Sequence, residues 1–296
     1  MKKMIDKYSN GVLLAPYILL FTLFIIIPVI AAVVLSFTYF NTIEPPSFVG
    51  IKNYINIFTN DQIFMQKVIP NTITFSIIVG IGGYILSFFL AWSLSQITKV
   101  PRTILAIIIY SPSMTGGVLL STVWGVIFNG DKSGYLNYIL LKLGVIAKPV
   151  LWLQSEEFLL PIMIIVTLWS SMGIGFLAIL AGIMNVNEEL YEASRIDGVK
   201  NRFQEIVYVT IPCAKPQMLF GAVMSIVSTF MASGVGVSLS GSNPTPGNAG
   251  QLIVTHIEDY GFLRYEMGYA AAISVVLLLI IRLASVGANK LFGGDE

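Results

Sequence analysis

Six long stretches of this chain contain no aspartate, glutamate, lysine or arginine. A helix that crosses a bilayer needs about 20 apolar residues, so these stretches constrain the fold more than any other feature. Five are long enough, and the shortest suffices when Arg282 extends its charged end to the membrane surface. We therefore predict an all-α, polytopic membrane protein with six transmembrane helices. The charged residues that bound the stretches are Lys7 and Glu44, Lys67 and Lys99, Arg102 and Asp131, Glu157 and Glu188, Lys215 and Glu258, and Glu266 and Arg282.

The composition agrees with a membrane protein. Only 11% of the 296 residues are charged, whereas soluble domains contain about 25%. The net charge of +1 argues against a strongly basic nucleic-acid-binding protein. Cys213 is the only cysteine, so the chain forms no internal disulfide. No repeat or linker divides the sequence, and we predict one transmembrane domain over residues 1–296.

Lysine and arginine are distributed unevenly between the two sides of the predicted membrane. Loops on the cytoplasmic side of membrane proteins carry an excess of these residues. With the N-terminus inside, the inner segments hold Lys2, Lys3, Lys7, Lys99, Arg102, Arg195, Lys200, Arg202, Lys215, Arg282 and Lys290, and the outer segments hold Lys52, Lys67, Lys132, Lys142, Lys148 and Arg264. We therefore predict a multi-pass protein of the cell membrane with both termini in the cytoplasm.

The segment 185–216 is charged and lies between two apolar stretches. Asn187 is a suitable helix N-cap, and the two glutamates after it fall where the helix dipole favours negative charge. Glycine adopts the left-handed conformation that ends many helices, so the first helix is predicted to end just before Gly198. A second amphipathic segment, from about residue 201 to 210, is predicted to end at Pro212.

This loop also carries a motif. The sequence Glu-Ala-Ser-Arg-Ile-Asp-Gly at 192–198, with Phe203 and Pro212 after it, resembles the EAA loop of binding-protein-dependent ABC importer permeases. In that family the loop contains a coupling helix that docks in a cleft of the ATPase subunit. The alternative interpretation is an ordinary solvated connector between two membrane helices. The resemblance assigns ATPase coupling to Glu192, Ala193, Ser194, Asp197, Gly198, Phe203 and Pro212.

Other segments resemble the sugar-permease branch of the same family, of the maltose and glycerol-phosphate type. The segment from Phe48 to Tyr54 resembles an outer loop of permeases that are paired with carbohydrate-binding proteins. The resemblance implies a carbohydrate substrate such as an oligosaccharide, a second permease subunit, ABC ATPase subunits and an extracytoplasmic solute-binding protein, all assembled in membrane lipid. It implies no cofactor and no catalytic residue in this chain, since ATP hydrolysis belongs to the partner subunits.

The charge-free stretches also bear on the substrate and the energy source. Secondary transporters often mark their ion pathway with charged residues inside the membrane, and none lies in the middle of a predicted span here. A pathway without charges suits a neutral, hydroxyl-rich solute, and Trp124, Ser228 and Thr229 are candidate pathway residues. His256 is the only histidine, so we predict a polar loop residue and no zinc site.

Three alternatives stay open at this point. They are an ABC importer for another neutral solute, an ion-coupled secondary transporter, and a membrane-embedded enzyme or scaffold. The first differs from the sugar importer only in its substrate. The second would transport solute without an ATPase, and the third would act independently of ATP.

Overall fold

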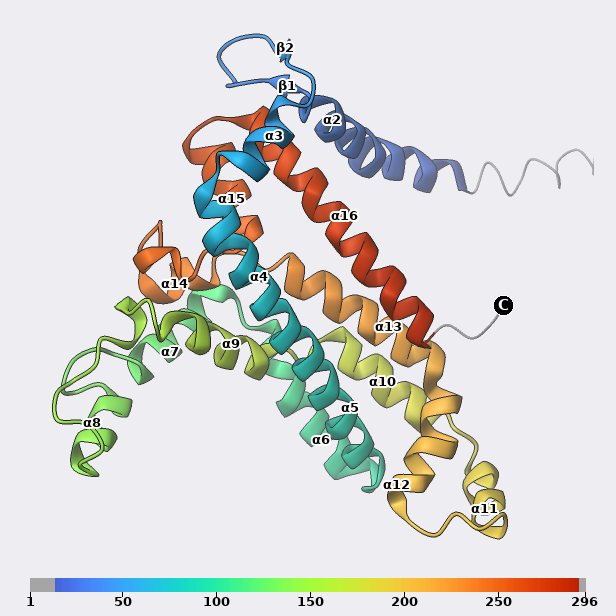
Figure 1. Cartoon of the computed structure of the whole chain (residues 1–296). Helices are drawn as coiled ribbons and strands as arrows, with labels where there is room; N and C mark the ends of the chain where they lie inside the picture. Colours follow the sequence, from blue (N-terminus) through green and yellow to red (C-terminus); the bar gives the residue numbers. More distant parts are fainter. Residues whose placement is uncertain (1–13, 293–296) are drawn as a thin grey trace, which may run out of the picture. The chain divides into compact units, whose positions relative to one another are not determined.

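The computed structural model describes residues 14–292 and is built almost entirely of helices (Figure 1). This confirms the predicted helical fold class. Within the described range the only strands are β1 (Thr38–Tyr39) and β2 (Ser47–Phe48), which pair antiparallel. The described chain forms two compact units, residues 14–61 with 256–278 and residues 62–255 with 279–292.

The first unit combines the start of the described chain with the start of the last long helix. Asn53 anchors its hairpin, because the buried Nδ2 donates to the carbonyl oxygens of Ser36 and Thr38 at 2.9 Å each. Gly268 lies against the same strand, where an added Cβ would collide with the Thr38 carbonyl oxygen. The elements are the helix Leu14–Leu35 with η1 (Thr22–Ile26) and α2 (Ile27–Leu35), then β1, β2, α3 (Lys52–Thr59), the end of α15 (Ile253–Glu258), η8 (Asp259–Leu263) and the start of α16 (Met267–Phe292).

A buried polar cluster lies in this unit and corrects the prediction for His256. The histidine is 4% exposed and lies on helix α15, so the prediction that it is a polar loop residue is wrong. Its Nε2 lies 2.9 Å from the Asp61 carboxylate, which also accepts a 2.9 Å hydrogen bond from the Tyr269 hydroxyl. The Tyr260 ring packs against both the His256 and Tyr269 rings, and burial, followed by the negative charge of Asp61, raises the pKa of Tyr260 to about 12.

The second unit contains the remaining helices. It begins with one continuous helix, Phe64–Ser95, and it also includes the long helix Arg202–Phe230. The first of these consists of η2 (Phe64–Val68), α4 (Ile69–Phe75), η3 (Ser76–Ile81) and α5 (Gly82–Ser95). The elements that follow are α6 (Lys99–Tyr110), η4 (Ser111–Met114), α7 (Gly117–Ile127), α8 (Tyr135–Lys142), η5 (Trp152–Gln154), α9 (Leu159–Ser170), α10 (Ile174–Met184), α11 (Glu188–Ile196), α12 (Arg202–Glu205), η6 (Ile206–Thr210), α13 (Ile211–Phe230), α14 (Val235–Ser240) and η7 (Pro246–Asn248).

Four helices within residues 14–292 are long and apolar enough to cross a membrane, or up to five if the bent pair α9 and α10 counts as one span. That pair bends by 42°. The predicted third span is divided into α6 and α7 by the short turn η4 and a non-helical step. The chain is thus a helical protein with several membrane-spanning helices, and the count of six stays a prediction. The four helices are Leu14–Leu35, Phe64–Ser95, Arg202–Phe230 and Met267–Lys290.

Pro212 does not end a helix, contrary to the sequence-based prediction. The helix that begins at Arg202 continues through it to Phe230, because the wider turn η6 precedes the proline. The residue before Pro212 donates its N–H to the carbonyl of Ile206, five residues back. A turn of this kind avoids the clash between a proline ring and the carbonyl four residues earlier. The same arrangement precedes Pro28 and Pro70.

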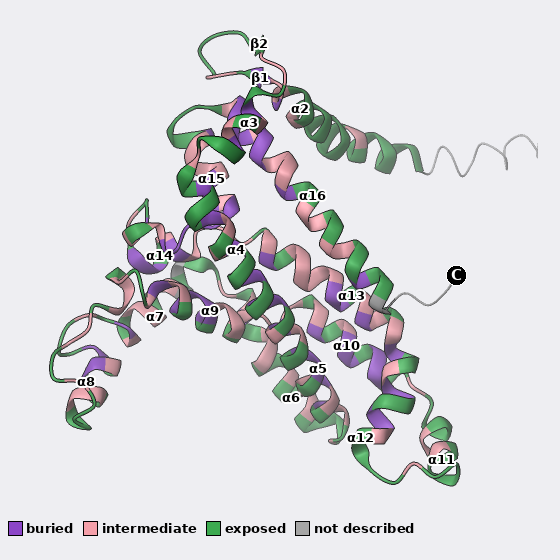
Figure 2. Ribbon diagram, viewed as in Figure 1, coloured by how far each residue is buried: buried purple, intermediate pink, exposed green. Residues whose placement is uncertain are grey.

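The packing of α5, α10 and α13 forms one of two apolar cores in the second unit (Figure 2). The backbones of α10 and α13 approach closely, since a Cβ added to Gly175 would lie 3.3 Å from the Gly221 Cα. At Gly182 an added Cβ would lie 2.7 Å from the Gln217 Cβ. Small residues at such contacts permit tight packing between membrane helices. The two helices are therefore packed tightly against each other at these contacts.

Candidate functional site

Helix α11 is the first part of the loop 185–216 and forms as the local sequence predicts. The Asn187 side chain accepts a 3.1 Å hydrogen bond from the Glu189 N–H and caps the helix. At the other end Gly198 has φ +98°, which a residue with a side chain rarely adopts. The N–H of Val199 then reaches back to the Ser194 carbonyl at 3.0 Å. These contacts close both ends of α11.

Most residues assigned to ATPase coupling lie on the surface of the second unit, where Figure 2 colours α11 largely as exposed. Two large apolar side chains of the loop are also exposed, Ile196 by 87% and Phe203 by 74%. The exception is Ser194, which is half-buried and donates to the Tyr191 carbonyl at 2.8 Å. The exposed coupling residues are Glu192, Ala193, Asp197, Gly198, Phe203 and Pro212.

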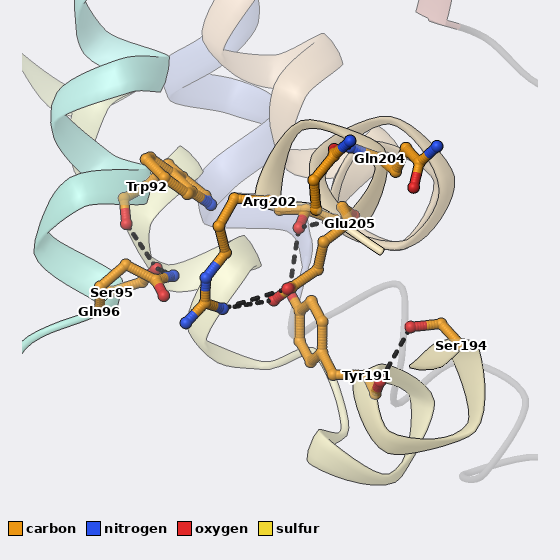
Figure 3. Close-up of polar contacts among 10 residues, drawn as sticks. Trp92, Ser95, Gln96, Tyr191, Ser194, Arg202, Gln204 and Glu205 are labelled. Carbon is orange, nitrogen blue, oxygen red and sulfur yellow. Dashed lines mark hydrogen bonds and ion pairs between the residues drawn. The ribbon is translucent and has the colours of Figure 1, made fainter. Parts of the chain in front are cut away.

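A polar junction connects α11 to the long helix that follows (Figure 3). The Arg202 guanidinium donates to both carboxylate oxygens of Glu205, at 3.0 and 3.1 Å, and Glu205 is only 8% exposed. The Tyr191 hydroxyl lies 3.1 Å from the Thr210 Oγ1. Burial raises the pKa of Tyr191 and outweighs the opposing hydrogen bond from Thr210. The sequence-based reasoning missed this junction, although Arg202 and Glu205 are spaced to meet on one helix face.

Beside the junction lies a hollow of about 320 Å³. Its walls carry both signs of charge, three arginines and three glutamates. Such a lining offers hydrogen-bond donors and acceptors to a charged partner surface rather than to a single ion. The charged lining residues are Arg102, Arg195, Arg202, Glu188, Glu192 and Glu205.

A second cavity, of about 370 Å³, lies among the helices of the same unit. None of its lining residues is charged, and hydroxyl-bearing residues from five helical segments contribute to its wall. The candidate pathway residues Ser228 and Thr229 line this cavity, and their role in solute transport stays a prediction. The hydroxyl-bearing lining residues are Tyr84, Ser87, Tyr110, Ser113, Thr167, Ser170, Ser171, Ser225, Ser228 and Thr229. Most of them were missed, because single hydroxyl residues in separate helices give no signal until the helices pack.

Trp124 does not line this cavity. It packs against the rings of Phe128, at 5.8 Å between centroids, and Trp169, at 5.6 Å. It belongs to the edge of the second apolar core, around Leu159 and Met163. In the described range no group of three histidine, cysteine or acidic residues could hold a metal ion.

Comparison with known proteins decides the family of the chain. Residues 7–289 match the family described as binding-protein-dependent transport system inner membrane component. The chain belongs to this family. It is therefore an integral membrane protein and a component of a transport system rather than an enzyme, and the predicted resemblance to the importer permeases is confirmed.

Two relatives illustrate the range of this transport family. The arabinooligosaccharides transport system permease protein AraP of Bacillus subtilis is 32% identical over 94% of this chain and 87% of its own length. The lactose transport system permease protein LacF of Rhizobium radiobacter is 27% identical over 93% of this chain and 91% of its own.

Two solved structures share the fold of this chain. A bacterial ABC transporter that imports the acidic polysaccharide alginate has a TM-score of 0.78 at 23% identity, and covers 98% of this chain and 96% of its own. The same type of transporter in complex with an alginate pentasaccharide-bound periplasmic protein has a TM-score of 0.79 at 22% identity, with the same coverage.

Proposed function

We propose that this chain is the permease subunit of an ATP-driven importer that moves a neutral oligosaccharide into the cell. One observation carries the proposal: an exposed helix, α11, is connected to an uncharged, hydroxyl-lined cavity through the packed pair α10 and α13. Helix α10 leads into the loop 185–216, and the long helix that ends with α13 leaves it. Both helices of the pair also contribute residues to the cavity wall.

The cavity supports a neutral, hydroxyl-rich solute. Hydroxyl groups both donate and accept hydrogen bonds, so they match the hydroxyls of a sugar without requiring a charge. An acidic sugar would be expected to require a cation in the wall, because a carboxylate is costly to remove from water without a partner. The relatives named for arabinooligosaccharides and lactose support the same substrate class. An importer for another neutral solute is the nearest alternative.

Helix α11 is proposed to dock in a cleft of an ABC ATPase. Large apolar side chains on an exposed, charged loop, here Ile196 and Phe203, are typical of an interaction surface. In the docked state Glu192 offers a charge to the ATPase, Asp197 and Gly198 set the turn, and Phe203 becomes a buried anchor. Closure of the ATPases then moves α10 and α13 together and switches the cavity between outward-open and inward-open states.

The membrane topology that goes with this function has six spans. Four are the long apolar helices, the bent pair α9 and α10 makes the fifth, and the broken pair α6 and α7 makes the sixth. Breaks inside a span are tolerated where other helices or water satisfy the backbone. Both termini and α11 lie in the cytoplasm, in agreement with the excess of basic residues on that side. A second permease subunit, two ATPases and an extracytoplasmic solute-binding protein complete the complex.

Reconstitution into proteoliposomes tests this function. The complex should accumulate a labelled neutral oligosaccharide only when the ATPase, ATP and the binding protein are present. An oligosaccharide of uronic acids of equal length should be a poor substrate. Transport by this chain alone would instead favour an ion-coupled carrier, and equal transport of the acidic sugar would contradict the argument from the uncharged cavity.

A further inference from the structure

One hydrogen bond connects the side chains of α11 to the helix that follows. It joins the Tyr191 hydroxyl to the Thr210 Oγ1 at 3.1 Å. Within residues 14–292 this is the only side-chain hydrogen bond between α11 and the continuous helix that runs from α12 to α13. The covalent connection between the two helices passes through the exposed turn at Gly198, which has no neighbouring atoms within 4 Å of an added Cβ.

Thr210 lies at a sensitive place in the long helix. It is the last residue of the wide turn η6, is 1% exposed, and precedes Pro212 by two positions. Its hydroxyl donates to the Glu205 carbonyl at 3.4 Å, which leaves an oxygen lone pair to accept a hydrogen bond from Tyr191. A force on Tyr191 therefore reaches the backbone of the long helix inside the core of the unit.

A charged pair lies beside Tyr191. Arg202 fixes the buried Glu205 carboxylate with two hydrogen bonds, and Figure 3 shows Arg202, Glu205 and Tyr191 pointing toward one another. Burial and the nearby Glu205 charge raise the pKa of Tyr191, so the hydroxyl keeps its proton at neutral pH. The Tyr191 hydroxyl therefore has a proton that it can donate to Thr210.

We propose that Tyr191 and Thr210 form the joint through which movement of α11 is transmitted to α13. This inference depends on the proposed function, in which α11 docks in an ATPase. Both are positioning residues, since neither touches the solute. The far end of α13 lines the hydroxyl-lined cavity with Ser225, Ser228 and Thr229. Without the hydrogen bond, bending of the turn at Gly198 takes up part of the movement of α11, and fewer cycles of ATP hydrolysis change the cavity.

The test uses substitutions that remove one hydroxyl and keep the shape of the side chain. They are Tyr191→Phe, Thr210→Val and the double variant, in the full complex in proteoliposomes. The control is Tyr208→Phe, which removes a tyrosine hydroxyl from the same turn at a side chain that is 68% exposed. Thr210→Ser keeps the hydroxyl and should couple normally.

We expect each single variant to insert, retain the ATPase and hydrolyse ATP, while solute transported per ATP falls about 2- to 10-fold, as the loss of one net hydrogen bond allows. The double variant should be no worse than the more severe single variant, because both remove the same contact. If the Tyr191→Phe variant transports as much solute per ATP as an active wild type, the proposed joint is wrong and the proposed function still stands. A wild-type chain that binds no ATPase would overturn the proposed function and the joint together.

Discussion

The turn at Gly198 gives the sharpest prediction, because the chain contains a matched control. Gly144 ends α8 with the same hydrogen bonds that Gly198 makes at the end of α11. In each case the glycine N–H donates to the carbonyl oxygen three residues earlier, at 3.1 Å for Gly144 and 3.3 Å for Gly198. The N–H of the valine after each glycine donates to the carbonyl oxygen five residues earlier, at 3.0 Å in both cases. Both glycines have positive φ, +70° and +98°, and an added Cβ at either would meet nothing within 4 Å.

The substitution Gly198→Val therefore acts only through the backbone. A β-branched residue held at positive φ costs about 1–3 kcal/mol, which lowers the equilibrium constant for forming the native turn by about 5- to 150-fold. If α11 docks only with this turn formed, and valine leaves the turn mostly in another conformation before docking, the apparent affinity of the ATPase falls within this range. Gly144→Val carries a similar backbone penalty in a different loop and should leave that affinity unchanged.

Titration of purified ATPase against each variant in nanodiscs measures this difference. Both variants should insert into the membrane, since neither glycine lies in a long apolar helix. We expect the dissociation constant to rise at least 5-fold for Gly198→Val and to equal the wild-type value for Gly144→Val. Equal affinities for the two variants would refute the reasoning that the shape of this turn controls docking.

Three further substitutions test the packing and the cavity. Gly182→Val should destabilise the protein by about 1–3 kcal/mol, because the added Cβ lies 2.7 Å from the Gln217 Cβ in the contact between α10 and α13. The Tm in detergent measures this loss, and the control Gly125→Val, at a position with open space, should lower the Tm much less. Asp61→Ala should lower the free energy of unfolding by about 3–5 kcal/mol, because it removes the buried carboxylate that binds His256 and Tyr269. The control Asp131→Ala, at an exposed residue, should change that free energy by less than about 0.5 kcal/mol. Ser228→Ala should leave the Tm unchanged and raise the KM for a neutral oligosaccharide about 2- to 10-fold, the value of one hydrogen bond; an unchanged KM would remove Ser228 from the pathway.

The sequence predicts local structure in this chain well where neighbouring residues determine it. The helix α11 is an example, since the Asn187 cap and the Gly198 turn depend only on residues within a few positions. The helical fold class follows equally from the long charge-free stretches. The docking role of α11, by contrast, depends on a partner chain and stays a prediction.

Other features depend on contacts that no local pattern reveals. His256 can be buried because the Asp61 carboxylate is its hydrogen-bond partner. The two residues are 195 positions apart in the sequence, so no local pattern reveals the contact. Pro212 lies within a continuous helix because the preceding turn widens, whereas the local rule predicts a break. The hydroxyl-lined cavity joins single residues from five helical segments, and Trp124, the most conspicuous side chain among the candidates, lies outside it.

The most direct test of the account is a cross-link between α11 and the ATPase. Glu192→Cys, in a chain that carries Cys213→Ser, places the only thiol on the exposed face of α11. After assembly with the ATPase, a short reagent that joins a thiol to a lysine amine should connect this thiol to the ATPase, and ATP should alter the yield. A thiol that reacts only with reagents added outside the cell, or a complex that transports at the wild-type rate and never cross-links, would contradict the central claim.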